Sequence, residues 1–188
     1  MNHQTFRAIV TCLTRRICGK QRTRLRTIAL ALLLPLIGTT PLAAQGNCQA
    51  VDDATNKMYA TPTHLYTTMD NIKNEMIYVG GTIYDKVSGK WARSQVTMQQ
   101  VMKFEQDNRQ HSKYTCRYLR DEAVNGEAAA VYSTHAERSD LAVKSDGQIW
   151  ISKTRGLPLR HEGDIDLGGG SKKHESTRYE YANVQPPL

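Results

Sequence analysis

The chain has 188 residues, with 25 lysines and arginines against 18 aspartates and glutamates, and a formal net charge of +7. This length is typical of a single domain. Seven of the basic residues and none of the acidic ones fall within residues 1–46, so the rest of the chain carries 18 of each. The basic excess therefore belongs to residues 1–46 and gives no support to nucleic-acid binding, because phosphate recognition needs positive charge on the folded domain.

Residues 1–46 have the pattern of a secretory signal peptide. Basic residues come first, an apolar run follows over residues 28–37, and a small-residue stretch leads to Ala44 and Gly46. Ten apolar residues are too few to cross a bilayer as a helix, which needs about 20. We expect cleavage after Ala44 or Gly46, export to the periplasm, and a single domain over residues 47–188.

The cysteines fit an exported protein. Cys12 and Cys18 lie in the predicted leader, and only Cys48 and Cys116 remain after cleavage. Two cysteines in an oxidising compartment allow one intramolecular bridge, so we expect a Cys48–Cys116 disulfide. The alternative is a pair of unpaired thiols.

The first half of the exported chain predicts two helices separated by strands. Residues 49–60 place apolar side chains at helical spacing, and Pro62 ends that helix. A strand is predicted over 63–69, and a long strand over 74–95 with a kink at Gly80-Gly81 and a turn at residues 87–90. Residues 96–108 carry the strongest helical pattern.

The second half predicts antiparallel strands in series. Residues 113–124 and 127–137 flank Asn125-Gly126, a strong hairpin signal. The further predicted elements are strands over 148–153, 157–167 and 176–184, with a flexible loop over 168–173. No alternation of strand and helix appears, so a parallel sheet is excluded. The pattern favours an α+β fold in which helices cover one face of a curved antiparallel sheet.

The sequence offers little reactive chemistry. The histidines of the exported chain are not at metal-ligand spacing, and no CxxC or serine-nucleophile motif occurs. For the polar cluster from His161 to Asp166 we predict a solvated strand face. An enzyme would require titratable groups that converge inside the sheet, and the sequence predicts none. We therefore expect no catalytic residue, no metal and no cofactor.

Aromatic and apolar residues alternate along the predicted strands. Such stripes are typical of an ordinary core, but a partly covered sheet face also lines cavities for apolar ligands. Methionines on the second predicted helix suit a lid, because methionine repacks readily. The candidate cavity residues are Tyr66, Ile77, Val79, Met98, Met102, Val131, Ile149, Ile151, Tyr179 and Tyr181.

The segments "GQIWISKTRGLPLRHE" and "STRYEYANVQPP" resemble the C-terminal part of LolA-type periplasmic proteins, a superfamily that includes LolB, LppX and RseB-type sensor domains. The matching residues include Trp150, Gly156-Leu157-Pro158 and Tyr181, and the resemblance extends over residues 114–187. It implies a strongly curved antiparallel half-barrel with helices covering the concave side. In this superfamily the cavity holds lipids or the acyl chains of lipoproteins.

Together these observations predict an exported, monomeric binding protein that holds a hydrophobic ligand, such as a lipid or an acyl chain, in a half-barrel cavity. A periplasmic or membrane protein would be its partner in transfer, and nucleic acid would not. The alternative is a periplasmic protein-interaction module, either a sensor domain or a toxin inhibitor, with a filled core.

Overall fold

The computed structural model describes residues 48–187, and the predicted signal peptide lies outside them. Helix α2 (Gln49–Tyr59) comes first and α3 (Met98–His111) lies between the fourth and fifth strands. The strands are β1 (Thr63–Met69), β2 (Ile72–Val79), β3 (Thr82–Val87), β4 (Lys90–Arg93), β5 (Lys113–Val124), β6 (Glu127–Arg138), β7 (Val143–Ser152), β8 (Pro158–Asp166) and β9 (Lys172–Glu180). Neither described helix is long and apolar enough to cross a membrane.

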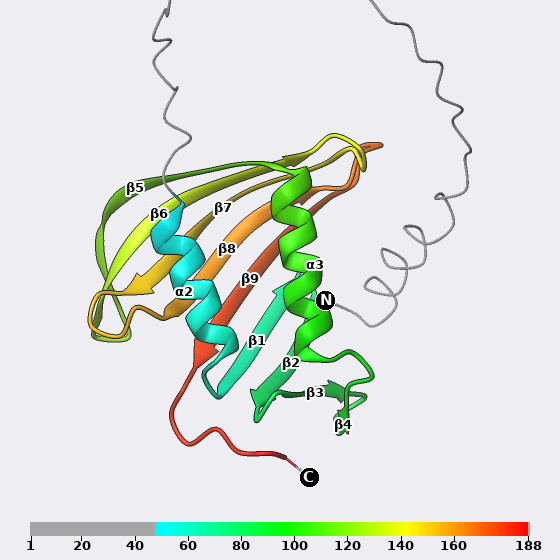
Figure 1. The fold of residues 1–188 in the computed structure, drawn as a ribbon, viewed down its shortest axis with the longest axis vertical. Helices are drawn as coiled ribbons and strands as arrows, with labels where there is room; N and C mark the ends of the chain where they lie inside the picture. The colour runs from blue at the N-terminus through cyan, green and yellow to red at the C-terminus, as the bar shows by residue number, and fades with distance from the viewer. Residues whose placement is uncertain (1–47, 188) are drawn as a thin grey trace, which may run out of the picture. The chain divides into compact units, whose positions relative to one another are not determined.

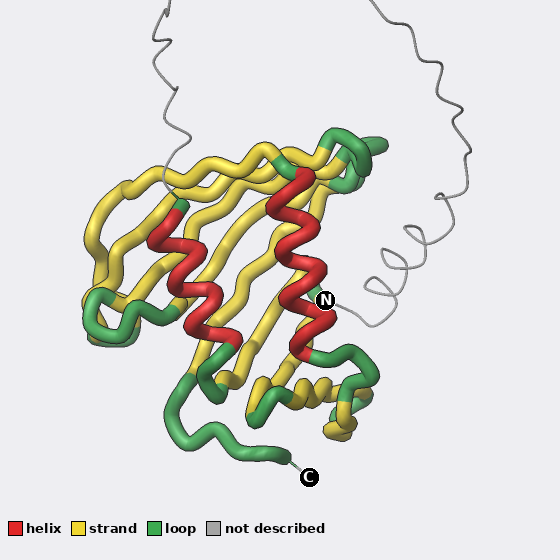
Figure 2. The backbone as a smooth tube through the Cα atoms, viewed as in Figure 1, coloured by secondary structure: helices red, strands yellow, loops and turns green. Residues whose placement is uncertain are grey.

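All nine strands form one antiparallel sheet in the order β4-β3-β2-β1-β9-β8-β7-β6-β5. The last strand, β9, pairs with β1 and so joins the first four strands to the block β5–β8. The sheet does not close, because β4 and β5 remain at its edges. It curves around α2 and α3, which both lie on the same face (Figures 1 and 2). The structure confirms the predicted α+β half-barrel with helices on its concave side.

A register shift between Tyr118 and Arg120 contributes to this curvature. Two residues on one strand then oppose one on its partner, which bends the strand and increases its twist. A second shift lies between Trp150 and Ile151, opposite Pro158 at the start of β8. The long strand β5 bends visibly along its length (Figure 1).

The turns explain where the predicted elements were right and where they were wrong. Asn125 and Gly126 have φ values of 52° and 82° and form the predicted hairpin turn. Gly80 and Gly81, at 57° and 74°, form a turn and not a kink, which separates β2 from β3. The turn predicted over residues 87–90 forms at Ser88 and Gly89 and separates β3 from β4. Residues 168–173 are a loop only in part, because β9 already begins at Lys172.

The inner face of the sheet, defined here as the face toward α2 and α3, carries two of the packed clusters. Their buried members are Met58, Leu65, Tyr78, Ile83, Met98 and Leu157 in the first, and Val51, Ala54, Cys116, Ile149 and Ile151 in the second. A third cluster is built around Val131 and Trp150 on the opposite, outer face. The guanidinium of Arg160 lies 4.8 Å from the centre of the Trp150 ring and helps to cover it.

Candidate functional site

A cavity of about 240 Å³ lies between the two helices and the inner face of the sheet. Helix α2 contributes four lining residues, α3 contributes Glu105 and Arg109, and the rest come from β5 to β9. The lining consists of Val51, Thr55, Met58, Tyr59, Glu105, Arg109, Tyr114, Thr134, Ile149, Pro158, His161 and Tyr179. The volume is slightly below the roughly 300 to 1,000 Å³ of pockets for drug-sized ligands.

Beside the cavity residues Thr134 and His161, the sheet carries a pair of glycines. Gly147 on β7 pairs directly with Gly163 on β8, and Gly147 also pairs with Thr134 on β6. A Cβ atom added at Gly147 would lie 3.1 Å from Nε2 of His161 and 2.7 Å from the Glu162 carbonyl oxygen. The imidazole of His161 therefore occupies space that any larger residue at position 147 would need.

The second half of helix α3 covers the cavity with polar side chains. Only Met98 at its start is buried, and its second half presents Glu105 and Arg109 to the cavity. Nη1 of Arg109 lies 2.7 Å from Oδ1 of Asp52 on α2, and the guanidinium lies 3.6 Å from the centre of the Tyr114 ring on β5. Arg109 thus connects both helices to the sheet. The pair with Asp52 is close but lacks good hydrogen-bond alignment, and about a third of each side chain is exposed, so its net stabilisation is small.

Burial dominates the electrostatics of the cavity. It raises the pKa of Glu105, which Arg109 opposes and Glu175 on β9 reinforces. It lowers the pKa of His161, against the attraction of Glu175 and Glu162. It also raises the pKa of Tyr59 and of Tyr179. Burial disfavours the charged form of a side chain, so the His161 imidazole is neutral at neutral pH.

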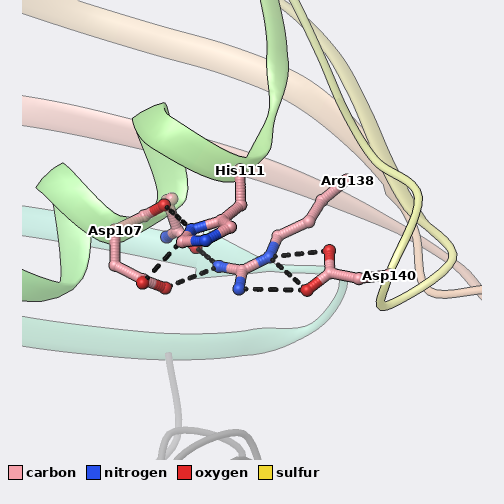
Figure 3. Close-up of polar contacts among 5 residues, drawn as sticks. Asp107, His111, Arg138 and Asp140 are labelled. Carbon is pink, nitrogen blue, oxygen red and sulfur yellow. Dashed lines mark hydrogen bonds and ion pairs between the residues drawn. The ribbon is translucent and has the colours of Figure 1, made fainter. Parts of the chain in front are cut away.

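The C-terminal end of α3 is fixed by a buried arginine on β6 (Figure 3). Nη1 of Arg138 donates to Oδ2 of Asp107 at 3.1 Å and to Oδ1 of Asn108 at 2.6 Å. Nε and Nη2 donate to the two carboxylate oxygens of Asp140 at 3.1 and 3.2 Å. The Arg138 side chain is only 7% exposed, whereas both aspartates are about half exposed.

The N-terminal ends of both helices are also fixed. Cys48 forms a disulfide with Cys116 on β5, which confirms the predicted pairing and joins α2 to the sheet. Thr97 caps α3: its Oγ1 accepts from the Gln100 backbone N–H, and Gln100 Oε1 accepts from the Thr97 backbone N–H. Such a capping box satisfies two amides that the helix itself cannot.

The structure brings two of the predicted cavity residues, Ile149 and Tyr179, to the cavity wall. Three others pack into the clusters beside the cavity: Met98 from the start of α3, and Ile151 and Tyr181 from the sheet side. Met102 is 47% exposed on the outside of α3. The prediction of a methionine-lined lid therefore does not match the placement of Met102.

Four predicted cavity residues, Tyr66, Ile77, Val79 and Val131, instead lie on the outer face. Alternate residues of a strand point to opposite faces, and the register assigns each of these four to the side away from the helices. Tyr66, for example, pairs with Arg178, whose guanidinium lies 4.1 Å from the ring centre. The sequence shows the alternation, but only the strand pairing shows which set faces the helices.

The polar half of the cavity was missed by the sequence prediction. Glu105, Arg109 and His161 converge there, although no converging titratable groups were expected. His161 was placed on a solvated face, but it lies on the inner side while Glu162 and Asp164 point outward. The i, i+4 spacing of Glu105 and Arg109 on a predicted helix was an available signal that they share one face. Among the described residues, no group of three acidic, histidine or cysteine side chains is arranged to hold a metal ion.

Comparisons with known proteins found similar solved structures at low sequence identity. No family model matches the chain, and no curated protein matches it. The lipoprotein LppX of Mycobacterium tuberculosis is similar in structure, with a TM-score of 0.43 and 9% identity over 73% of this chain and 97% of that one. LprF of Mycobacterium bovis has a TM-score of 0.41 and 11% identity over 74% of this chain and 95% of that one. Both likenesses are at low sequence identity, so the function of this chain has to be argued from the cavity.

Proposed function

We propose that the chain is an exported, periplasmic binding protein whose helix-covered cavity holds a hydrophobic ligand, such as a lipid or the acyl chain of a lipoprotein. The observation that carries this proposal is the cavity of about 240 Å³ between α2, α3 and the curved sheet. Interiors of folded proteins are otherwise packed as densely as organic crystals. A partly open space of this size between the two helices and the sheet is therefore accessible to a ligand that enters from solvent.

The apolar part of the wall would provide the binding free energy. Val51 and Met58 on α2 face Ile149 and Pro158 across the cavity. Each ligand methylene that leaves water there would contribute about 0.8 kcal/mol. A long chain needs more volume than the cavity offers, and α3 is the element suited to move, because its middle is held over the floor by polar and half-exposed contacts.

Binding is a better account of this site than catalysis. Among the described residues, the hydrogen bonds between a histidine ring and a carboxylate side chain join His135 to Asp146 at 2.7 Å and His174 to Asp164 at 2.8 Å. Both pairs are exposed on the outer face. Acid–base dyads that would activate a nucleophile are thus found away from the cavity rather than in it.

The test introduces a bulky side chain into the cavity from the sheet. Thr134→Phe adds a ring on the inner face of β6, whereas Ser133→Phe adds a ring at the neighbouring position, which faces outward. We expect Thr134→Phe to weaken binding of a fluorescent fatty-chain probe at least tenfold and Ser133→Phe to leave it within twofold. Equal binding by both variants, when both unfold at similar temperatures, would contradict a ligand site in this cavity.

Mild purification followed by mass spectrometry provides an independent measurement. The proposal expects a lipid or another amphiphile to co-purify with the wild-type protein and to be depleted from Thr134→Phe. A preparation that contains no such molecule, and that also binds no added probe, would favour the alternative of a protein-interaction module. The specific feature that favours that alternative is the open edge of β5, since an unpaired edge can accept a strand from another protein.

A further inference from the structure

The polar end of the cavity carries more negative than positive charge. Glu105 and Arg109 both line it, and the Arg109 guanidinium already lies 2.7 Å from the Asp52 carboxylate. Glu175 on β9 is close enough to Glu105 to raise its pKa. His161 on β8 is held neutral by burial. Three carboxylates therefore share one region with a single arginine.

That arginine is already engaged. Its guanidinium stacks 3.6 Å from the centre of the Tyr114 ring while it pairs with Asp52. An anionic ligand would have to compete with Asp52 for it, and would approach Glu105 as well. A cationic ligand meets the opposing charge of one guanidinium, that of Arg109, against three carboxylates in the same region.

The aromatic residues of the lining also favour a cation. Tyr59, Tyr114 and Tyr179 reach the cavity from α2, β5 and β9. Aromatic faces attract ammonium groups, and cages of such rings are the usual site for substituted ammonium ligands. The Arg109 guanidinium already covers the ring of Tyr114, so the half-buried carboxylate of Glu105 supplies the counter-charge, and Tyr59 and Tyr179 supply the aromatic wall.

We propose that this cavity binds the positively charged head group of an alkylammonium-type amphiphile, with the Glu105 carboxylate as the counter-charge, in preference to the carboxylate head group of a fatty acid. The inference rests on the proposed function, since it names the chemical class of the hydrophobic ligand. A volume of about 240 Å³ holds roughly eight waters at about 30 Å³ each, which is room for a head group and a short tail.

The experiment compares two ligands with the same tail and opposite charge. Binding of n-octylammonium and of octanoate to the full chain is measured by isothermal calorimetry at neutral pH. We expect n-octylammonium to bind at least tenfold more tightly. In Glu105→Gln the difference should fall to less than threefold, because the counter-charge is gone.

The matched control is Asp53→Asn. Asp53 is an exposed residue of α2 outside the cavity lining, and its Oδ1 accepts a hydrogen bond from Gln49 within the helix. This variant loses the same unit of charge but should keep the preference for n-octylammonium. A preference that falls equally in both variants would mean that the net charge of the protein, and not Glu105, sets it, and would overturn the assignment.

The dependence on pH provides a second readout. A bound ammonium favours the ionised carboxylate, so affinity for n-octylammonium should increase as the pH rises through the raised pKa of Glu105. The other charged or titratable groups around it are Arg109 on α3, Asp52 on α2, His161 on β8 and Glu175 on β9. Protonation of His161 at acidic pH would weaken cation binding too, and Glu105→Gln separates the two effects because it retains the contributions of His161, Asp52 and Glu175 and removes only that of Glu105.

Two results would overturn the inference. Octanoate could bind as tightly as n-octylammonium, or Glu105→Gln could keep the wild-type preference while its unfolding temperature stays unchanged. In both cases the protein still binds an amphiphile, so the proposed function survives. Failure of both ligands to bind, together with failure of the fatty-chain probe, would instead overturn the proposed function and this inference with it.

Discussion

Two histidines of neighbouring strands show how the face of the sheet decides the state of a side chain. His161 on β8 points inward, and burial lowers its pKa below the ordinary value of 6.5. His174 on β9 points outward, and its hydrogen bond to Asp164 raises its pKa above that value. The same residue type is thus shifted in opposite directions on opposite faces of one sheet.

We expect titration of the histidine ring protons by NMR to resolve this difference, with His161 titrating below 6.5 and His174 above it. Asp164→Asn should lower the pKa of His174 and leave that of His161 unchanged. The two histidines titrating together would contradict the assigned faces. For stability, the His161 contribution is complete above the unfolded-state pKa and is lost as the pH falls toward the lower folded-state value, so His161 makes the protein easier to unfold in mild acid. The raised pKa of the exposed His174 acts in the opposite direction.

At the scale of the elements, α3 is helical by its own sequence but is held over the cavity by polar contacts to its surroundings. It buries one residue, Met98, and its far end depends on Arg138 of β6 (Figure 3). A buried guanidinium that bonds to Asp107, Asn108 and Asp140 fixes the helix over the cavity. This arrangement keeps the cavity covered without filling it.

Replacement of that arginine tests the role of α3 directly. We expect Arg138→Gln to reduce the free energy of unfolding by about 1 to 3 kcal/mol, the range for hydrogen bonds to charged groups, and to increase amide hydrogen exchange at residues 107–111. The comparison is Arg120→Gln, which breaks an exposed pair with Glu122 and should cost less than about 1 kcal/mol. Equal effects from the two substitutions would mean that the buried contacts do not hold the helix.

At the scale of the whole molecule, the disulfide fixes one wall of the cavity. Cys48 precedes α2 and Cys116 lies in the edge strand β5, 68 residues later in the chain. Closing a loop of this length in the unfolded chain removes conformational freedom, for which the entropic estimate is about 4 kcal/mol. Four cavity residues come from α2, so loosening that helix should affect binding as well as stability.

We therefore expect the double variant Cys48→Ser, Cys116→Ser to lose about 4 kcal/mol of unfolding free energy in a denaturant titration. Its affinity for the fatty-chain probe should also fall. Reduction of the wild-type protein should reproduce both effects. A loss below about 1 kcal/mol would show that packing alone holds α2 against the sheet.

The sequence by itself determined the features that depend on neighbouring residues. Asn125-Gly126 can adopt positive φ and so predicts its hairpin, and the helical spacing of Val51, Ala54 and Met58 predicts α2. The two cysteines left after the leader predict the disulfide. The serial strands and the motif over residues 147–162 predict the curved antiparallel sheet.

Only the tertiary structure decided which side chains share the cavity. Alternation along a strand separates two faces but does not identify the buried one, so Tyr66, Ile77, Val79 and Val131 were assigned to the wrong side. The convergence of Glu105 from α3 with His161 from β8 requires the packing of segments more than fifty residues apart. The local sequence determines the backbone angles of a turn or a helix. The set of residues that line a cavity depends instead on strand register and on the position at which a helix packs against the sheet.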